Sequence, residues 1–190
     1  VSYCLFGSKK HLMNELFEKK NLPFYKFGDA IYLAKIETKY WIEYICKRFE
    51  NTGKHISPEL AEEICRLVDN HSSYVQQLSW LLWIRTINTA TTEQLSYALE
   101  DLLDQNNILF QSETENLSAY QMNFLKAIVD GIHTKFSSKE VISKYNLGTS
   151  ANIVRLKNAL LQKELIETNG KEIVLADPVF GVWFKKEMLY

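Results

Sequence analysis

The sequence lacks an apolar run long enough to cross a bilayer, which takes about 20 residues. Its longest apolar segments, residues 1–6 and 78–84, are only long enough for elements of a protein core. The start of the chain has neither the basic region nor the small-residue cleavage site of a secretory signal. These absences predict a cytoplasmic protein with no membrane segment.

Cysteine is scarce as well, with three residues that are widely separated and form no C-x-x-C pair. Cys46 and Cys65 lie on apolar faces of predicted helices, where a thiol behaves as a small hydrophobic group. This usage predicts a reduced compartment and no disulfide framework. None of the four histidines has a ligand partner one helical turn away, so no metal site is predicted.

The composition is that of a globular protein, with 46% hydrophobic and 24% charged residues. The net charge of −1 conceals an asymmetry between the two parts of the chain. Residues 1–115 carry 12 basic and 16 acidic side chains, or −4, whereas residues 116–190 carry 10 and 7, or +3. The asymmetry indicates two units, and a charge of +3 permits only a weak nucleic-acid surface.

The first 36 residues predict a strand–helix–strand segment. Residues 1–6 are apolar and stop at Gly7-Ser8, helical spacing follows over 9–20, and a second apolar strand covers 30–33. Such a slice of an α/β layer cannot bury its own faces. Because the chain also begins with Val, we expect a fragment whose missing α/β part precedes it. Exposed strand edges favour pairing with another chain, which predicts either dimerisation through these strands or marginal solubility.

Residues 37–115 predict an all-helical unit. Ser57-Pro58-Glu59 has the features of a helix start: a capping serine, a proline at the first position and an acid in the first turn. Thr91 precedes a similar start. The expected helices, joined by short connectors, are 38–50, 58–69, 74–86 and 92–106.

Residues 116–190 predict a winged-helix domain. Two short apolar strands are joined by Asn169-Gly170, the strongest short-range hairpin signal. Three helices, a tight turn before the third, and a two-stranded wing form the order of a winged helix, a relative of the helix-turn-helix. The expected helices are 118–130, 139–145 and 151–163, and the expected strands are 165–168 and 172–175.

Three local patterns together resemble the AAA+-type, STAND-like ATPases of archaea and Bacteroidetes. The first is Leu5-Phe6-Gly7-Ser8 with Pro23-Phe24-Tyr25, similar to the fourth core strand and the entry to the fifth. The second is Tyr74-Val75-Gln76-Gln77-Leu78 with Leu82-Trp83, similar to a lid helix. The third is Asp177-Pro178-Val179-Phe180 with Trp183-Phe184, similar to the segment that closes the family's winged helix.

The resemblance implies a mainly α fold in three parts. Residues 1–36 would be the remnant of a P-loop ATPase core, 37–115 a four-helix lid, and 116–190 a winged-helix domain with a β-hairpin. The whole protein would use ATP and Mg²⁺ as a nucleotide-dependent switch. Its partners would be the missing P-loop domain and a protein or DNA that meets the winged helix.

The resemblance also implies three nucleotide-proximal residues. Ser8 matches sensor 1, the polar residue at a strand end that positions the attacking water. Lys26 stands where relatives carry Arg, and it keeps the charge but not the bidentate fork. His71 stands where relatives carry a Gly-x-Pro signature. The alternatives are that Ser8 simply ends a strand, Lys26 is a solvated loop cation and His71 only caps a helix.

The sequence lacks the parts that perform phosphoryl transfer. No G-x-x-x-x-G-K-[ST] is present to cradle phosphates, and no apolar strand ends in Asp-Glu to hold the metal. We therefore expect this fragment to be inactive as an ATPase by itself and to hold no bound cofactor.

The third helix of the winged-helix unit offers side chains that suit DNA. Asn and Arg read base edges in the major groove and Lys meets phosphates. The candidates are Asn152, Arg155, Lys157 and Lys163 on the helix and Lys171 near the tip of the wing. The same residues also fit a solvated helix face, and we expect a protein or intramolecular contact more than DNA.

Core positions are expected on the same helix and in the last segment. They are Val154, Leu156, Leu160 and Leu161, together with Val179, Phe180, Val182, Trp183 and Phe184. The alternative function is that of a winged-helix transcriptional regulator that binds DNA and dimerises through its helical half.

Overall fold

The computed structural model describes residues 4, 6–7, 16–17, 19–25, 27–29, 31 and 33–189. The chain divides into two compact units, residues 1–34 and 35–190. The predicted strand–helix–strand of residues 1–36 lies largely outside the described residues, and so do Ser8 and Lys26.

In the described part of the first unit, short turns and aromatic contacts connect residues 16–17, 19–25 and 27. Leu16 and Phe17 are helical. The ring of Phe24 lies 6.1 Å from that of Phe17 and 5.9 Å from that of Phe27, measured between centroids. The backbone N–H of Leu22 donates to the carbonyl of Lys19 at 3.1 Å.

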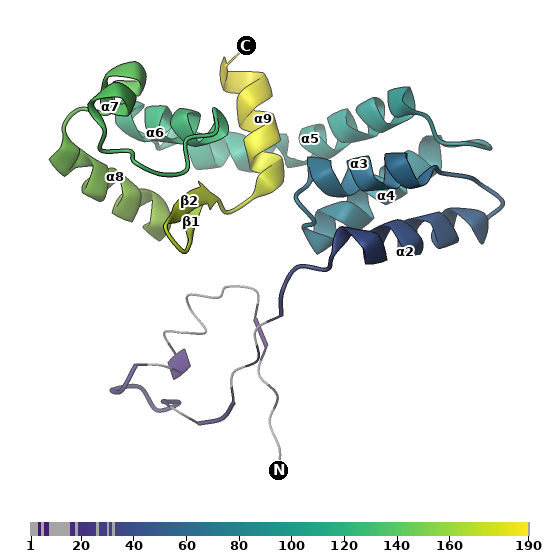
Figure 1. Cartoon of the computed structure of the whole chain (residues 1–190), viewed down its shortest axis with the longest axis horizontal. Helices are drawn as coiled ribbons and strands as arrows, with labels where there is room; N and C mark the ends of the chain where they lie inside the picture. The colour runs from purple at the N-terminus through teal and green to yellow at the C-terminus, as the bar shows by residue number, and fades with distance from the viewer. Residues whose placement is uncertain are drawn as a thin grey trace. The chain divides into compact units, whose positions relative to one another are not determined.

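The second unit is mainly helical, which confirms the predicted fold class. Its described residues form eight helices and one two-stranded antiparallel sheet (Figure 1). The elements are α2 (Thr38–Glu50), α3 (Pro58–Leu67), α4 (Ser72–Arg85), α5 (Thr92–Glu115), α6 (Ala119–Val129), α7 (Lys139–Tyr145), α8 (Ser150–Gln162), β1 (Ile166–Asn169), β2 (Glu172–Leu175) and α9 (Pro178–Leu189).

Side-chain caps fix several helix starts where the sequence predicts them. Ser57 Oγ accepts from the backbone N–H of Leu60 at 3.2 Å at the start of α3. Reciprocal capping boxes open α5, with Thr91 at the cap, and α6, with Ser118 at the cap. Each cap satisfies N–H groups that have no partner inside the helix, so these boundaries follow from local chemistry.

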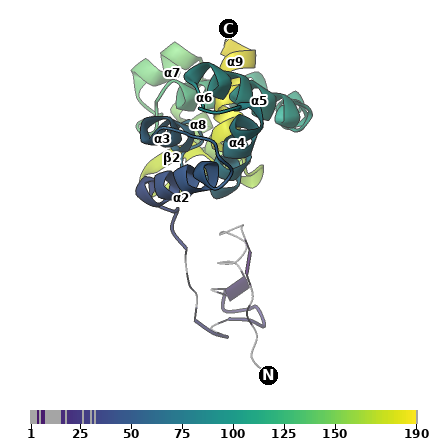
Figure 2. The same cartoon turned by 90° about the vertical axis from the view of Figure 1, so that its right-hand side faces the viewer.

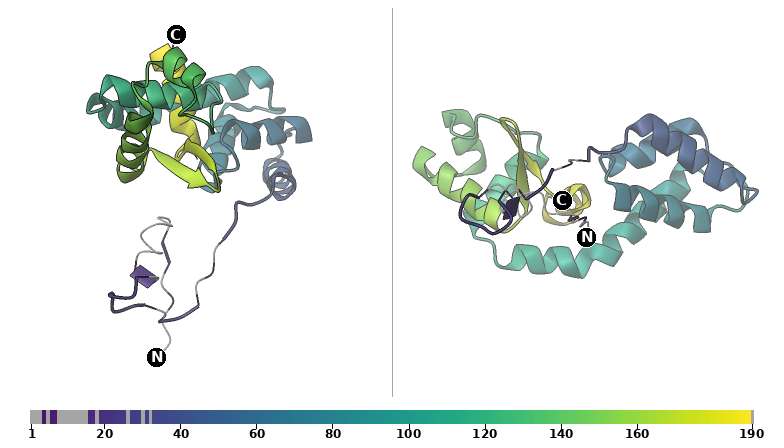
Figure 3. Two further views of the ribbon diagram at one scale, coloured as in Figure 1. Left: turned by 60° about the vertical axis from the view of Figure 1, so that its left-hand side comes forward. Right: turned by 90° about the horizontal axis from the view of Figure 1, so that it is seen from below.

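Helix α5 is longer than predicted. It continues past the expected end near Asn106 to Glu115 and spans 24 residues. No glycine or proline interrupts it, and Leu102, Phe110 and Thr114 keep its buried face in helical register. The right-hand view of Figure 3 shows α5 running from the helices α2–α4 to the winged-helix elements.

The last part of the chain has the winged-helix order of elements. Helices α6, α7 and α8 are followed by the β1–β2 hairpin, in which Ile166 pairs with Leu175 and Asn169 with Glu172. Helix α9 then packs against α5 and α6 (Figure 2). Its apolar residues Phe180, Trp183 and Phe184 are buried, as predicted.

The prediction of one core residue is wrong. Val154 is 62% exposed, and its neighbour Ile153 is buried in its place. Both are apolar and adjacent in sequence, so helical spacing alone leaves the phase of α8 open by one residue. Within the part of the chain that the structure describes, no helix has both the length and the apolar character needed to cross a bilayer.

Candidate functional site

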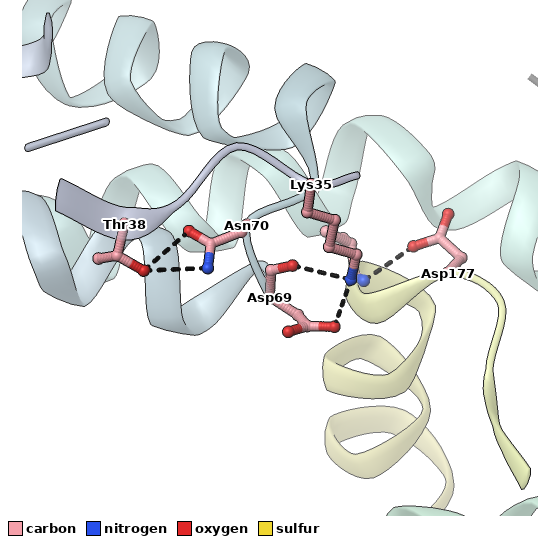
Figure 4. Close-up of polar contacts among 6 residues, drawn as sticks. Lys35, Thr38, Asp69, Asn70 and Asp177 are labelled. Atoms are coloured by element: carbon pink, nitrogen blue, oxygen red, sulfur yellow. Dashed lines mark hydrogen bonds and ion pairs between the residues drawn. The ribbon is translucent and has the colours of Figure 1, made fainter. Parts of the chain in front are cut away.

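A tight loop joins α3 to α4 and is held by side chains from the start of α2 and from the segment just before it. Asp69 and Asn70 have positive φ angles of 48° and 54°, which Asp and Asn tolerate better than most residues. Thr38 Oγ1 and the Asn70 side chain exchange hydrogen bonds of 3.0 and 3.2 Å. Lys35 Nζ donates to the carbonyl of Asp69 at 2.9 Å and to its carboxylate at 2.6 Å (Figure 4).

His71 ends this loop and occupies the N-cap position of α4. Its side chain makes no capping hydrogen bond. The imidazole ring lies 4.8 Å from the ring of Tyr74, and its Nδ1 is buried without a partner among the described residues. A buried nitrogen in this state is uncommon in folded proteins.

Tyr74 connects α4 to the start of α9. Its hydroxyl donates to Asp177 Oδ2 at 2.5 Å, and the residue is only 9% exposed. The other carboxylate oxygen of Asp177 accepts from the backbone N–H groups of Val179 at 2.8 Å and Phe180 at 3.0 Å, so it caps α9. One carboxylate therefore serves both helices; Figure 4 includes Asp177 just before α9.

The surroundings of this hydrogen bond shift the acidity of its neighbours. Burial raises the pKa of Tyr74, and the hydrogen bond and negative charge of Asp177 raise it further. Burial also raises the pKa of Glu113, with a second contribution from the charge of Asp177. Tyr74 thus stays protonated and acts as a donor at neutral pH.

A second set of contacts joins α5 to α9. Trp183 Nε1 donates to Asn107 Oδ1 at 2.8 Å. The ring of Phe110 lies 5.5 Å from Phe180 and 5.6 Å from Trp183. Together with the Tyr74–Asp177 hydrogen bond, these contacts hold α9 to both helices of the α4–α5 pair.

The five DNA candidates fall into different surroundings. Asn152 and Arg155 line one open hollow of about 400 Å³ at the start of α8. Asn152 is half-buried, and its amide nitrogen donates to the carbonyl of Leu147 at 3.0 Å. Lys157 is half-buried on α8. Two exposed lysines lie away from the hollow: Lys163 caps the end of α8, and Lys171 lies in the hairpin turn.

A second hollow, of about 480 Å³, lies beside the α3–α4 loop and is acidic. Its lining includes Glu59, Glu62, Glu63 and Asp69 but only one basic residue, Arg66. Burial raises the pKa of the adjoining Cys65 thiol to about 11, so this thiol is not a nucleophile at neutral pH. No group of His, Cys, Asp and Glu in the described residues is placed to hold a metal ion.

Tyr74 and Asp177 both belong to motifs found in the sequence, but the sequence did not predict that they contact each other. Tyr74 opens one motif and Asp177 opens another, 103 residues later. The usable signal was a tyrosine on an otherwise apolar helix face, because a buried hydroxyl needs a partner. Nothing local identified Asp177 as that partner.

Comparisons with known proteins agree with this architecture. Residues 108–186 match a family model described as a probable winged helix domain. Among solved structures, the fold resembles the Walker-type ATPase PABY2304 of Pyrococcus abyssi, with a TM-score of 0.67 and 17% sequence identity. That match covers 92% of this chain and 50% of the other, so the chain spans about half the length of the ATPase structure.

A comparison with curated protein sequences gave no match. The family model begins inside α5, which shows that this helix contributes to the winged-helix part of the fold. Residues 108–186 therefore form a winged-helix domain, in a chain whose fold resembles about half of a Walker-type ATPase structure.

Proposed function

We propose that this chain is the lid and winged-helix portion of a P-loop ATPase that acts as a nucleotide-dependent switch. The observation that carries the proposal is the Tyr74–Asp177 hydrogen bond, which joins the first turn of α4 to the N-terminus of α9. A shift of α4 would be transmitted to α9 because the half-buried carboxylate of Asp177 accepts hydrogen bonds from both helices.

The α3–α4 loop is the proposed sensing end of this connection. The resemblance assigns His71 a place near the nucleotide, together with Ser8 and Lys26. The buried, unpartnered Nδ1 of His71 supports that role, since it is available to a group outside the described residues. Its ring touches Tyr74, so a change at His71 reaches the hydrogen bond directly.

The described residues do not fit a site for ATP phosphates or Mg²⁺. Lys35 is bonded to Asp69, and Arg66, the basic residue that lines the adjoining hollow, is bonded to Glu63. The carboxylates in the lining of that hollow would repel phosphate. We therefore assign this chain the response to nucleotide and place hydrolysis in a P-loop core.

The experiment compares the product of the complete open reading frame, its Tyr74→Phe variant and the 190-residue chain. We expect the complete protein to hydrolyse ATP and the 190-residue chain to release no phosphate above a blank. ATP should change hydrogen exchange in α9 of the complete protein, and Tyr74→Phe should remove at least half of that change.

The proposal fails if the complete reading frame contains no G-x-x-x-x-G-K-[ST]. It also fails if ATP leaves the exchange of α9 unaltered in the unmodified protein. Tyr97→Phe provides the matched control, because Tyr97 is 50% exposed and makes only a 3.4 Å contact with Glu93.

A further inference from the structure

The outward face of α8 has an apolar centre. Ala151, Val154, Arg155 and Asn158 are exposed at helical spacing, and Val154 is 62% exposed. A base-reading helix presents mainly hydrogen-bonding side chains at its centre. An exposed valine on this face instead suits contact with an apolar side chain of a partner.

A preformed hollow adjoins this face. Tyr120 from α6 and Gly148, Ala151 and Arg155 from the turn and start of α8 contribute to its lining. Gly148 has φ +83°, and a Cβ added there would lie 3.4 Å from the Tyr120 ring. The ring therefore packs closely over the turn, which fixes one wall of the hollow.

The charges of α8 and of the hairpin favour an anionic partner that contacts the helix but not the wing. Helix α8 (Ser150–Gln162) contains Arg155 and Lys157 and no acidic residue, a net charge of +2. The hairpin that follows carries Glu167 and Glu172 against one Lys171. A DNA duplex would bring phosphates to both helix and wing, and the wing would repel them.

We propose that the α8 face and its hollow bind an acidic protein segment with an apolar anchor. The anchor packs on Val154 and Tyr120, and a flanking carboxylate pairs with the exposed Arg155 guanidinium, which suits bidentate pairing. The inference rests on the proposed function, in which the winged helix is the part that meets the partner.

The test selects phage-displayed random 16-residue peptides on the immobilised 190-residue chain. Enriched peptides should combine several Asp or Glu residues with one or two large apolar residues. The most enriched peptide is then labelled and titrated by fluorescence anisotropy against the chain and its variants, at low and at physiological salt.

Arg155→Glu should weaken that peptide at least tenfold, and Val154→Ser by about threefold to tenfold. Lys171→Glu is the matched control: it makes the same charge reversal on the wing and should change affinity less than twofold. Val154, Arg155 and Lys171 are all exposed, and equal thermal unfolding of the variants verifies that the fold is retained.

The proposal is overturned if the selected peptides are basic or show no bias, or if Arg155→Glu and Lys171→Glu weaken binding equally. It is also overturned if selection from randomised 20-base-pair duplexes yields a DNA that binds more tightly than the best peptide. None of these results alters the ATP-dependent exchange of α9, so this proposal and the proposed function fail separately.

Discussion

At the scale of single residues, Tyr74 is buried and its hydroxyl needs a hydrogen-bond partner. Its ring belongs to the apolar face of α4, and its hydroxyl would be unsatisfied there without Asp177. The carboxylate is in turn stabilised by the N–H groups at the start of α9. Breaking one member therefore affects two helices.

Tyr74→Phe should lower the free energy of unfolding by about 1–2 kcal/mol, because a hydrogen bond to a charged group is lost while Asp177 keeps its two backbone donors. Urea denaturation followed by circular dichroism measures the change. Tyr97→Phe, with its exposed hydroxyl, should alter stability by less than about 0.5 kcal/mol. Equal losses in the two variants would contradict the assigned strength of the Tyr74 contact.

Glu113 makes stability depend on pH in the direction opposite to a salt-bridged acid. Burial and the charge of Asp177 raise its pKa in the folded state above the ordinary 4.5, so the folded state binds the proton more tightly. Its ionised form therefore destabilises the fold at neutral pH, and this penalty disappears as pH falls through the folded pKa towards 4.5.

Glu113→Gln should consequently raise the melting temperature at pH 7, and its advantage over the unmodified chain should shrink as pH approaches 4.5. Melting curves at several pH values provide the measurement. Glu115→Gln, on an exposed neighbour at the end of α5, is the matched control. An advantage of Glu113→Gln that grows on acidification would show that the sign is wrong.

At the scale of elements, the turn between α7 and α8 determines which face α8 presents. Asn146 and Gly148 both have positive φ, of 49° and 83°. Asn152 reaches back from α8 to the carbonyl of Leu147, and Leu147 itself is fully buried. These contacts fix the rotation of α8 and leave Val154 outside.

Gly148→Ala should destabilise the protein by about 1–3 kcal/mol. Positive φ costs an alanine about 1–2 kcal/mol, and the new Cβ would lie only 3.1 Å from Asn152 Nδ2. Gly53→Ala is the matched control, because Gly53 has φ +73° with nothing within 4 Å of an added Cβ. Chemical denaturation gives the free energy of unfolding of both variants, and the difference between their losses is the cost of the close contact with Asn152. Equal losses for Gly53→Ala and Gly148→Ala would show that this contact costs nothing.

At the scale of the whole second unit, α5 and α9 make residues 35–190 one compact body. Helix α5 packs against α4 and against α9, and its second half belongs to the winged helix. The aromatic cluster of Phe110, Phe180 and Trp183 lies where α9 meets α5. We therefore expect helices α2–α4 and the winged helix to unfold together.

Phe110→Ala tests this coupling. Phe110 is 1% exposed, and its truncation should cost about 3–5 kcal/mol through lost burial and a cavity. Tryptophan fluorescence and far-ultraviolet circular dichroism should report one coincident, shifted transition. Two separate transitions in the unmodified chain would show that helices α2–α4 and the winged helix unfold independently. Leu109→Ala is the control, because Leu109 is 54% exposed, and it should change the free energy of unfolding little.

Local chemistry in the sequence determined most helix starts and the hairpin. Ser57-Pro58 and Thr91 specify helix starts because their side chains satisfy or remove free N–H groups within one turn. Gly170 specifies the hairpin turn because it has a φ of +62°, which glycine tolerates, whereas Asn169 is the last paired residue of β1. Interactions between residues within one turn of each other can be predicted from a few adjacent residues of the sequence.

Only the tertiary structure decided the remaining features. The phase of α8 depended on whether Ile153 or Val154 met the core. The Tyr74–Asp177 pair joins residues 103 positions apart. A buried hydroxyl needs a hydrogen-bond partner, and a tyrosine on an apolar helix face therefore predicts that one exists. Which carboxylate reaches the hydroxyl depends on how the helices pack, and no local sequence pattern contains that information.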